Sequence, residues 1–497
     1  MQLEERFMSR WVEAISKAGE LPNYLFIDGQ KIFAGGRDQI ETFDPGSGLL
    51  LTAVAAGKAS DVDNAVLVAK RALDGPWAKL TPKDRSRLLW EVGSRIRQDI
   101  KRLTLVETLD TGKPFNDAKV TVERTADYFC YYAGIVDKLE GTTVPLGPSK
   151  LCFTERVPIG VTGHIVPWNV PISMVARGLA PALACGNTAV VKPAEETPLS
   201  AILLVELLED TGIPAGVVNV IPGFGKEAGR ALSEHPEVHH ITFTGSIPTG
   251  KAVMAAAATH LASVTLELGG KSPHVVLRDA DLDVAIPSIL TGMYKNAGQI
   301  CSAGTRLLVD RPIHEEVVDR LVKGAESISL GHGLDNPAMG PLISDQQLAS
   351  VVGFAQRARD RGVTFATGGD KAQVTECEGG YFFTPSIADN VPPEDELGTA
   401  EVFGPILSVI GVDDVDHAID VANGTSYGLA AGIQTQDISK AMRFARGVEA
   451  GQVFINGYHS AGDTVPFGGM KESGIGREKG LAALDAYCEI KAVTVTF

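Results

Sequence analysis

Residues 264–272 read Val-Thr-Leu-Glu-Leu-Gly-Gly-Lys-Ser and join an apolar run to a Gly-Gly corner. The run predicts a buried β-strand that ends at residue 268. Glu267 lies near the end of this strand, where glycine lets the backbone approach a ligand closely. A buried acid beside such backbone can have a raised pKa and serve as a general base. An ion pair at the strand end is the commoner fate of a lone glutamate.

Upstream of this stretch, segments that favour strand alternate with segments that favour helix. The other predicted strands span residues 161–166, 189–192, 217–221 and 240–243. Helical runs separate them at residues 174–183, 199–208, 227–232 and 249–258. This alternation predicts an α/β fold, with a parallel sheet covered on both faces and ligands at the carboxyl ends of its strands. The segment before residue 139 is predicted to be largely helical, and no catalytic or binding motif can be recognised in it.

Downstream, residues 298–304 read Gly-Gln-Ile-Cys-Ser-Ala-Gly and place Cys301 between glycines. A thiol in this setting can attack an electrophile and also offer its own backbone N–H to the product. The other five cysteines lie in ordinary apolar or helical segments, so Cys301 is the candidate nucleophile. An inert, packed thiol is the alternative. A second alternating region follows, with strands expected at residues 305–309, near Phe382 and at residues 407–410.

Bulk properties narrow the class of protein. The 497 residues carry 45 basic and 61 acidic side chains, and the net charge of −16 argues against nucleic-acid or anionic-membrane partners. Six cysteines without a Cys-x-x-Cys pair, and ten histidines without a His-Glu-x-x-His motif, predict no disulfide framework and no metal site. The acidic start at Met1 predicts no signal peptide, and no apolar stretch has the length of a membrane span. We therefore expect a cytoplasmic protein.

The stretches 264–272 and 298–304 together resemble the aldehyde dehydrogenase superfamily. The resemblance implies that Cys301 attacks an aldehyde to form a thiohemiacetal, and that hydride transfer to a nicotinamide then leaves a thioester. It implies Glu267 as the base that activates water to release the acid. Asn169, which follows the first strand in Pro-Trp-Asn, would stabilise the oxyanion together with the Cys301 N–H. By default, an asparagine there would be a helix cap.

The resemblance also implies an NAD site. Lys192 and Glu195 follow the second strand and would bind the adenosine ribose, and the carboxylate would repel a 2′-phosphate. The remaining predicted cofactor contacts are Trp168, Gly225, Gly245, Ser246, Glu401 and Phe403. From the residues alone, Ser246 reads as a plain N-cap and Phe403 as a core residue.

Charged and aromatic residues near the expected aldehyde entrance suggest the substrate. Arg177 and Lys295 would favour an anionic semialdehyde by charge-assisted hydrogen bonds. Each cation could equally point to solvent or pair with an acid. Tyr458 and His459 would close the pocket and could stack on an aryl ring, so an aryl aldehyde is the alternative substrate. Glu478 matches a proton-relay acid, but many relatives carry a lysine where this chain has Gly178, which puts the relay in doubt.

The resemblance implies three interleaved units. Residues 1–138 and 158–268 would form a Rossmann-like NAD-binding domain, and residues 269–478 an α/β catalytic domain. Residues 139–157 and 479–497 would form a small β oligomerisation arm, giving a homodimer or homotetramer. Two other classes remain open: a cysteine hydrolase, which needs a histidine beside Cys301, and a non-catalytic binding protein on the same fold.

Overall fold

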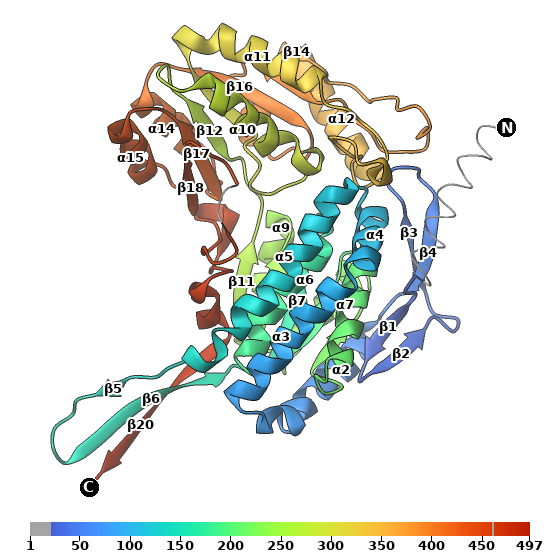
Figure 1. Cartoon of the computed structure of the whole chain (residues 1–497), viewed down its shortest axis with the longest axis vertical. Helices are drawn as coiled ribbons and strands as arrows, with labels where there is room; N and C mark the ends of the chain where they lie inside the picture. The colour runs from blue at the N-terminus through green and yellow to red at the C-terminus, as the bar shows by residue number, and fades with distance from the viewer. Residues whose placement is uncertain (1–20, 460–461) are drawn as a thin grey trace.

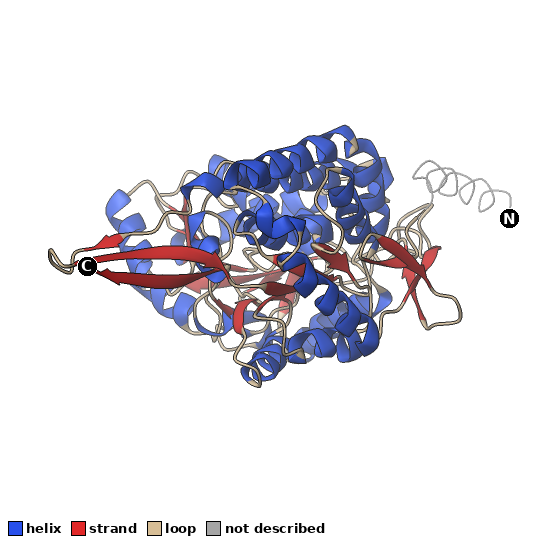
Figure 2. Cartoon of the chain, turned by 90° about the horizontal axis from the view of Figure 1, so that it is seen from below, coloured by secondary structure: helices blue, strands red, loops and turns tan. Residues whose placement is uncertain are grey.

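The computed structural model describes residues 21–459 and 462–497. Two sheets, each covered by helices, form the body of the molecule, and a narrow β arm projects from it beside the C-terminus (Figure 1, Figure 2). The expectation about a signal peptide concerns residues outside the described part of the chain. In the described part, no helix is long and apolar enough to cross a bilayer.

The first sheet contains all five strands predicted before residue 269. In sheet order, its strands are β19 (Gly474–Ile475), β11 (Ser263–Glu267), β10 (His240–Thr244), β7 (Val161–Ile165), β8 (Thr188–Lys192), β9 (Val218–Val220), β1 (Tyr24–Ile27) and β2 (Gln30–Phe33). β7 to β11 are mutually parallel, whereas the edge strands pair antiparallel. The parallel strands therefore end along one edge of the sheet, where Glu267 lies.

Helices bury both faces of this sheet, as the continuous apolar strands require. The helices are α2 (Ala59–Leu73), α3 (Pro82–Gln98), α4 (Ile100–Thr111), α5 (Phe115–Ala133), α6 (Pro171–Ala184), α7 (Leu199–Asp210), α8 (Arg230–Glu234) and α9 (Ile247–Ala258). Side chains alternate between the faces of a strand. In β8, Ala189 and Val191 join the core formed by α3 to α7, whereas Val190 joins the core under α2 and α9.

The second sheet lies beyond Glu267 in the chain. Its order is β14 (Thr364–Thr367), β15 (Ser386–Asp389), β16 (Ile406–Val412), β13 (Arg306–Asp310), β12 (Pro273–Val276), β17 (Ala430–Gln434) and β18 (Gln452–Ile455). Its longer helices are α10 (Leu282–Tyr294), α11 (His314–Glu326), α12 (Asp345–Asp360), α14 (Val415–Asn423) and α15 (Ile438–Gly447). The prediction of a strand near Phe382 was wrong. Phe382 is buried in a loop, and the strand begins only after Pro385, which has no backbone N–H to donate to a neighbouring strand.

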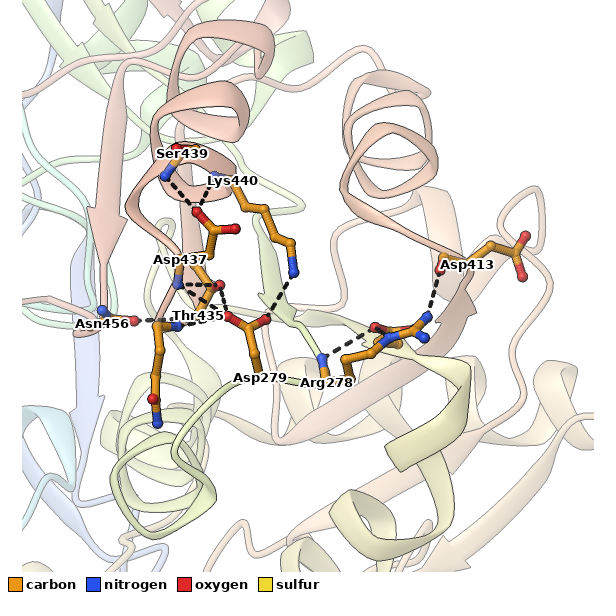
Figure 3. A network of polar contacts seen from close by, with 10 residues as sticks. Arg278, Asp279, Asp413, Thr435, Asp437, Ser439, Lys440 and Asn456 are labelled. Carbon is orange, nitrogen blue, oxygen red and sulfur yellow. Dashed lines mark hydrogen bonds and ion pairs between the residues drawn. The ribbon is translucent and has the colours of Figure 1, made fainter.

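A polar network fixes one end of this second sheet (Figure 3). Asp279, which follows β12, accepts hydrogen bonds from Thr435 Oγ1 at 2.6 Å and from the Asp437 N–H at 3.1 Å. Lys440 Nζ lies 3.4 Å from the same carboxylate. These contacts hold the loop after β17 and the first turn of α15 against the end of β12.

The arm contains β5 (Thr143–Val144), β6 (Lys150–Pro158) and β20 (Cys488–Thr496), with β6 in the middle. The chain leaves the second sheet earlier than the boundary predicted at residue 478, because β19 pairs with β11 of the first sheet. Leu484 and Tyr487 then pack into the first core, so within the segment predicted at residues 479–497 the strand of the arm starts at Cys488. A two-residue strand carries no periodic signal from which this return could be predicted.

Candidate active site

A cavity of about 440 Å³ is lined by residues from both sheets. Cys301, Glu267 and Asn169 all line it, although they are far apart in sequence. Glu267 reaches it from the end of β11, Asn169 from the loop between β7 and α6, and Cys301 from the loop after α10. The strand-end position predicted for the site is therefore where the three candidate residues meet.

The loop that carries Cys301 has an unusual backbone. Asn296, Ala297 and Gly298 have φ values of 53°, 54° and 73°, a left-handed run that costs free energy in non-glycine residues. A Cβ at Gly298 would lie 2.5 Å from the Gly404 carbonyl oxygen, so only glycine fits. The buried Gln299 side chain holds the loop by donating to the Asn296 carbonyl at 3.0 Å and accepting the Ile343 N–H at 2.9 Å.

The Cys301 thiol is partly exposed to the cavity. Burial raises its pKa to about 12, while Arg177 acts in the opposite direction, as does a hydrogen bond to sulfur from the Ser302 N–H. The thiol is therefore protonated at neutral pH in this state. It becomes a nucleophile when a base takes its proton or when a ligand adds positive charge nearby.

Two hydrogen-bond donors are available for an oxyanion beside Cys301. Asn169 Nδ2 donates one hydrogen to the Gln299 carbonyl at 2.9 Å, which fixes the amide and leaves its second hydrogen for the cavity. Asn296 Nδ2 in turn donates to the Asn169 carbonyl at 3.3 Å. Within the described part of the chain, the Cys301 N–H donates no hydrogen bond. This pair of donors suits the stabilisation of a tetrahedral oxyanion.

Glu267 has the environment of a general base. It is only 1% exposed, and neither carboxylate oxygen has a hydrogen-bond partner among the residues that the structure describes. Burial raises its pKa well above the usual value and Glu478 raises it further, whereas Arg177 lowers it. An acid whose pKa is raised in this way can accept a proton from water and later release it.

The predicted substrate cations line the cavity, but both are paired. Arg177 Nε forms an ion pair with Glu478, and its guanidinium lies 4.3 Å from the centre of the Phe467 ring. Lys295 Nζ lies 3.4 Å from the Asp117 carboxylate. In the structure, Arg177 and Lys295 therefore each pair with an acid, which was the alternative to a role in substrate binding.

The two aromatic candidates have separate positions. His459 lines the cavity, and its Nε2 lies 3.1 Å from Ser302 Oγ. Burial lowers the His459 pKa to about 4, so the ring is neutral. Tyr458 is not among the lining residues; its hydroxyl donates to the Ser302 carbonyl at 3.0 Å and its ring stacks on His274. Tyr458 therefore packs against the loop that carries Cys301 without lining the cavity. The cysteine-hydrolase alternative needs a histidine that is hydrogen-bonded to Cys301. No histidine among the described residues makes this hydrogen bond.

The residues predicted to bind the adenosine ribose contact one another. Lys192 Nζ lies 2.8 Å from Glu195 Oε2, and the Gly225 N–H donates to Glu195 Oε1 at 2.6 Å. The Glu195 carboxylate is thus held in place with lone pairs left for hydroxyl donors. Gly245 and Ser246 line the cavity, and Ser246 also caps α9 by accepting the Thr249 N–H at 3.4 Å. The α9 N-terminus suits a pyrophosphate.

The residues predicted to bind the nicotinamide half line the same cavity as Cys301 and Glu267. Glu401 accepts the Gly270 N–H at 2.9 Å, and burial raises its pKa to about 7. Trp168 and Phe403 pack edge to face at 5.1 Å and form part of the cavity wall. Phe403 has a φ of 54°, and Gln347 Nε2 holds its carbonyl at 2.8 Å. Strained backbone at a ligand clamp of this kind commonly has a functional origin.

Part of the cavity wall comes from the helical segment before residue 139, in which the sequence analysis recognised no catalytic or binding motif. Along one face of α5, lining residues recur at helical spacing: Asp117, Val120, Thr121, Arg124 and Tyr128. Lys479, beside Glu478, is a further lining residue that the sequence analysis missed. The mixture of charged and apolar residues on one face of α5 was the signal that could have revealed this role.

Comparisons with known proteins agree on one family. A sequence profile of the aldehyde dehydrogenase family matches residues 33–493. The putative aldehyde dehydrogenase DhaS of Bacillus subtilis is 42% identical over 474 residues, which cover 95% of each chain. The NAD⁺ complex of aldehyde dehydrogenase from Bacillus cereus has a TM-score of 0.94 at 41% identity and covers 98% of both chains. Betaine aldehyde dehydrogenase from Staphylococcus aureus, in complex with NAD⁺, has a TM-score of 0.95 at 35% identity, covering 98% of this chain and 97% of that one.

Proposed function

The chain belongs to the aldehyde dehydrogenase family, and on this premise we propose that it oxidises an aldehyde to a carboxylic acid with NAD as hydride acceptor. One observation carries the proposal: a nucleophile, a buried base and an oxyanion donor line one cavity with five of the eight residues predicted to contact the dinucleotide, namely Trp168, Gly245, Ser246, Glu401 and Phe403. The NAD⁺ complexes of the Bacillus cereus and Staphylococcus aureus relatives support the choice of cofactor.

The mechanism uses the three residues in sequence. The Cys301 thiol loses its proton to water, and the resulting thiolate attacks the aldehyde carbon. The carbonyl oxygen becomes an oxyanion held by the Asn169 amide and the Cys301 N–H. Glu195 and Glu401 would hold NAD at its two riboses, and NAD would supply the oxidising power by taking up a hydride from this carbon. The acyl group then remains on Cys301 as a thioester. Glu267 removes a proton from water, the resulting hydroxide attacks the thioester carbonyl, and the acid leaves as the thiol is restored.

For the substrate, we propose two classes of aldehyde. An anionic semialdehyde is supported by the cations in the cavity wall, although Arg177 and Lys295 are already paired. An aryl aldehyde is supported by the rings of Tyr128, Phe454 and Phe467, which also line the cavity. We further propose a homo-oligomer built through the β arm. The cytoplasm is the proposed location, since all six cysteines are free thiols.

A direct assay tests the function. Purified protein is incubated with NAD or NADP and with matched aldehydes, including butanal, succinic semialdehyde, benzaldehyde and 4-carboxybenzaldehyde, while the absorbance of reduced cofactor is followed. We expect reduction with at least one class of aldehyde, together with an equal amount of carboxylic acid. If no aldehyde in the panel reduces either cofactor, the proposed function is wrong.

A further inference from the structure

The cavity wall contains five basic side chains other than histidine in addition to the candidate catalytic residues. Four of them are each held by a carboxylate: Arg177 by Glu478, Lys113 by Glu107 at 2.9 Å, Lys295 by Asp117 at 3.4 Å, and Arg124 by Asp463 at 3.3 Å. The fifth is Lys479, whose side chain forms no hydrogen bond or ion pair with any residue in the described part of the chain. The unpaired positive charge of the wall therefore belongs to Lys479.

Backbone contacts fix the position of Lys479. The residue before it is locked to Phe467 by two hydrogen bonds, of 2.7 and 2.8 Å, between the backbones of Phe467 and Glu478. The residue after it, Gly480, accepts the Tyr132 hydroxyl at 2.9 Å. Lys479 itself has a φ of 62°, a left-handed conformation that is costly for lysine. Its side chain is thus directed to the cavity by its flanking residues and by its own strained backbone, with no counter-ion to attract it.

Two aromatic rings contact the ammonium. Lys479 Nζ lies 5.2 Å from the centre of the Phe467 ring and 6.0 Å from that of Tyr128, both of which line the cavity. A cation over a ring face is stabilised only modestly, so these contacts leave capacity for an anion. Burial lowers the Lys479 pKa to about 7, and Arg177 and Arg124 lower it further, whereas Asp463 and Glu478 act in the opposite direction. A carboxylate that enters the cavity beside Lys479 would favour the charged ammonium form.

Three acids line the same cavity: Asp117, Glu267 and Glu401. Asp117 is paired with Lys295 at 3.4 Å, and Glu267 lies 4.0 Å from Arg177. Burial raises the pKa of Glu267 and Glu401, which disfavours the charged form of each acid. A carboxylate that enters the cavity therefore meets less negative charge than three fully solvated acids would present.

We propose that Lys479 is the anion-binding residue of the aldehyde cavity, and that the substrate is an aldehyde with a carboxylate a few bonds from its carbonyl carbon. This inference rests on the proposed function and extends it to a substrate class. It assigns the carboxylate to Lys479 in place of Arg177 and Lys295. Phe467 and Tyr128 then contact the apolar atoms between the aldehyde and the carboxylate, which accommodates either an aliphatic or an aryl spacer.

The test compares matched substrates in three variants. Lys479→Met removes the charge and keeps the length, Lys479→Arg keeps a charge, and Lys295→Met is a control in which the lost cation was already paired. For each protein, kcat/KM is measured with succinic semialdehyde and butanal, and with 4-carboxybenzaldehyde and benzaldehyde. In Lys479→Met, we expect the anionic-to-neutral ratio to fall by roughly ten-fold or more. Lys479→Arg should keep most of the anionic-to-neutral ratio. Lys295→Met should change this ratio less than three-fold, because an exposed ion pair contributes little free energy.

Inhibition by succinate gives a second measurement that does not depend on turnover of an aldehyde acid. Succinate should compete with butanal in the wild type and lose affinity in Lys479→Met. Thermal unfolding of each variant verifies the fold, and Lys479→Gln replaces the methionine variant if that variant is unstable. Equal losses for anionic and neutral aldehydes, or unchanged succinate inhibition, would overturn the inference while leaving aldehyde oxidation intact. A wild type that oxidises no aldehyde would instead overturn the proposed function, and the inference with it.

Discussion

Arg177 lies between two buried acids: its Nε is ion-paired with Glu478, and its Nη2 is 4.0 Å from Glu267 Oε1. Glu478 is held on its other side by the Thr242 hydroxyl at 2.8 Å. Gly178 occupies the next position on α6, so no lysine is available there to neutralise Glu478. Arg177 provides that positive charge from the neighbouring position. Its first role is therefore electrostatic, toward the base and the acid beside it.

We expect Arg177→Leu to impair all aldehydes together. Arg177 lowers the pKa of both Cys301 and Glu267, so its loss should raise both values. Because thiolate and carboxylate are the active forms, the acidic limb of the kcat profile should then move to higher pH. Removing one partner of a buried ion pair should also cost about 3–5 kcal/mol of unfolding free energy. Kinetics with butanal across pH, and urea unfolding, measure the two effects. A loss confined to succinic semialdehyde would show instead that Arg177 binds the carboxylate.

Cys301→Ala should abolish aldehyde oxidation. The sulfur is the atom that bonds to the substrate, and no other described cysteine lines the cavity. NAD binding, measured by calorimetry, should stay close to the wild-type value because none of the predicted cofactor contacts changes. Cys130→Ala serves as the control and should keep full activity, since Cys130 lies on α5 and contacts Arg97. Substantial oxidation by Cys301→Ala would remove Cys301 from the mechanism.

Glu267→Gln should separate the two halves of the reaction. The amide has nearly the same shape but cannot accept a proton from water, so thioester hydrolysis should slow far more than hydride transfer. Stopped-flow mixing should show a burst of reduced cofactor, about one per active site, followed by slow turnover. In the wild type, the steady rate should fall as pH drops through the raised pKa of Glu267, whereas the variant should lose this dependence. If the burst disappears in a folded variant, Glu267 acts before the thioester forms.

The sequence was sufficient for the parts of the fold with strong local signals. The strand patterns before residue 269 appear in the structure as β7 to β11, because each is a continuous apolar run between helical segments. Cys301 and Glu267 could be identified because glycines mark their loops. Close packing explains one of these glycines: a Cβ at Gly270 would lie 2.3 Å from the Cys301 carbonyl oxygen.

Pairings between distant segments were beyond the reach of the sequence. Nothing local in the chain shows that Glu478 would neutralise Arg177, or that Asp117 would do the same for Lys295, because tertiary packing decides which charges meet. The aromatic side chain of Tyr458 likewise gives no sign that it would support the Cys301 loop instead of the substrate. Lys479 was missed since a lone lysine after a conspicuous glutamate reads as an ordinary surface residue.

Glu195 should make NAD the preferred cofactor. Its carboxylate is fixed by Lys192 and the Gly225 N–H, so a 2′-phosphate at this ribose would face a negative charge that cannot turn away. Glu195→Gln should therefore lower kcat/KM for NAD modestly and raise it for NADP, changing the ratio by roughly ten-fold, the effect of about 1.4 kcal/mol. Glu196→Gln removes the adjacent carboxylate and should leave the ratio near the wild-type value. A wild type with higher kcat/KM for NADP would contradict the role of Glu195.

The β arm should mediate self-association. β20 pairs with β6 along nine residues, but its other edge carries no strand in the described chain. Unpaired strand edges invite association, and apolar side chains on this arm, such as Ile490 at 67% and Phe497 at 79% exposure, add to the tendency. Light scattering should show a dimer or tetramer for the wild type.

The double variant Ile490→Lys/Val495→Lys should lower the measured mass, because charges on an edge strand oppose pairing with another copy. Leu261→Lys is the matched control: Leu261 is 92% exposed and lies between α9 and β11, away from the arm, so the mass should not change. Measurements over a range of protein concentrations distinguish weakened association from none. A wild type that stays monomeric at every concentration would show that the exposed edge of β20 is tolerated without a partner, and the proposed assembly would be wrong.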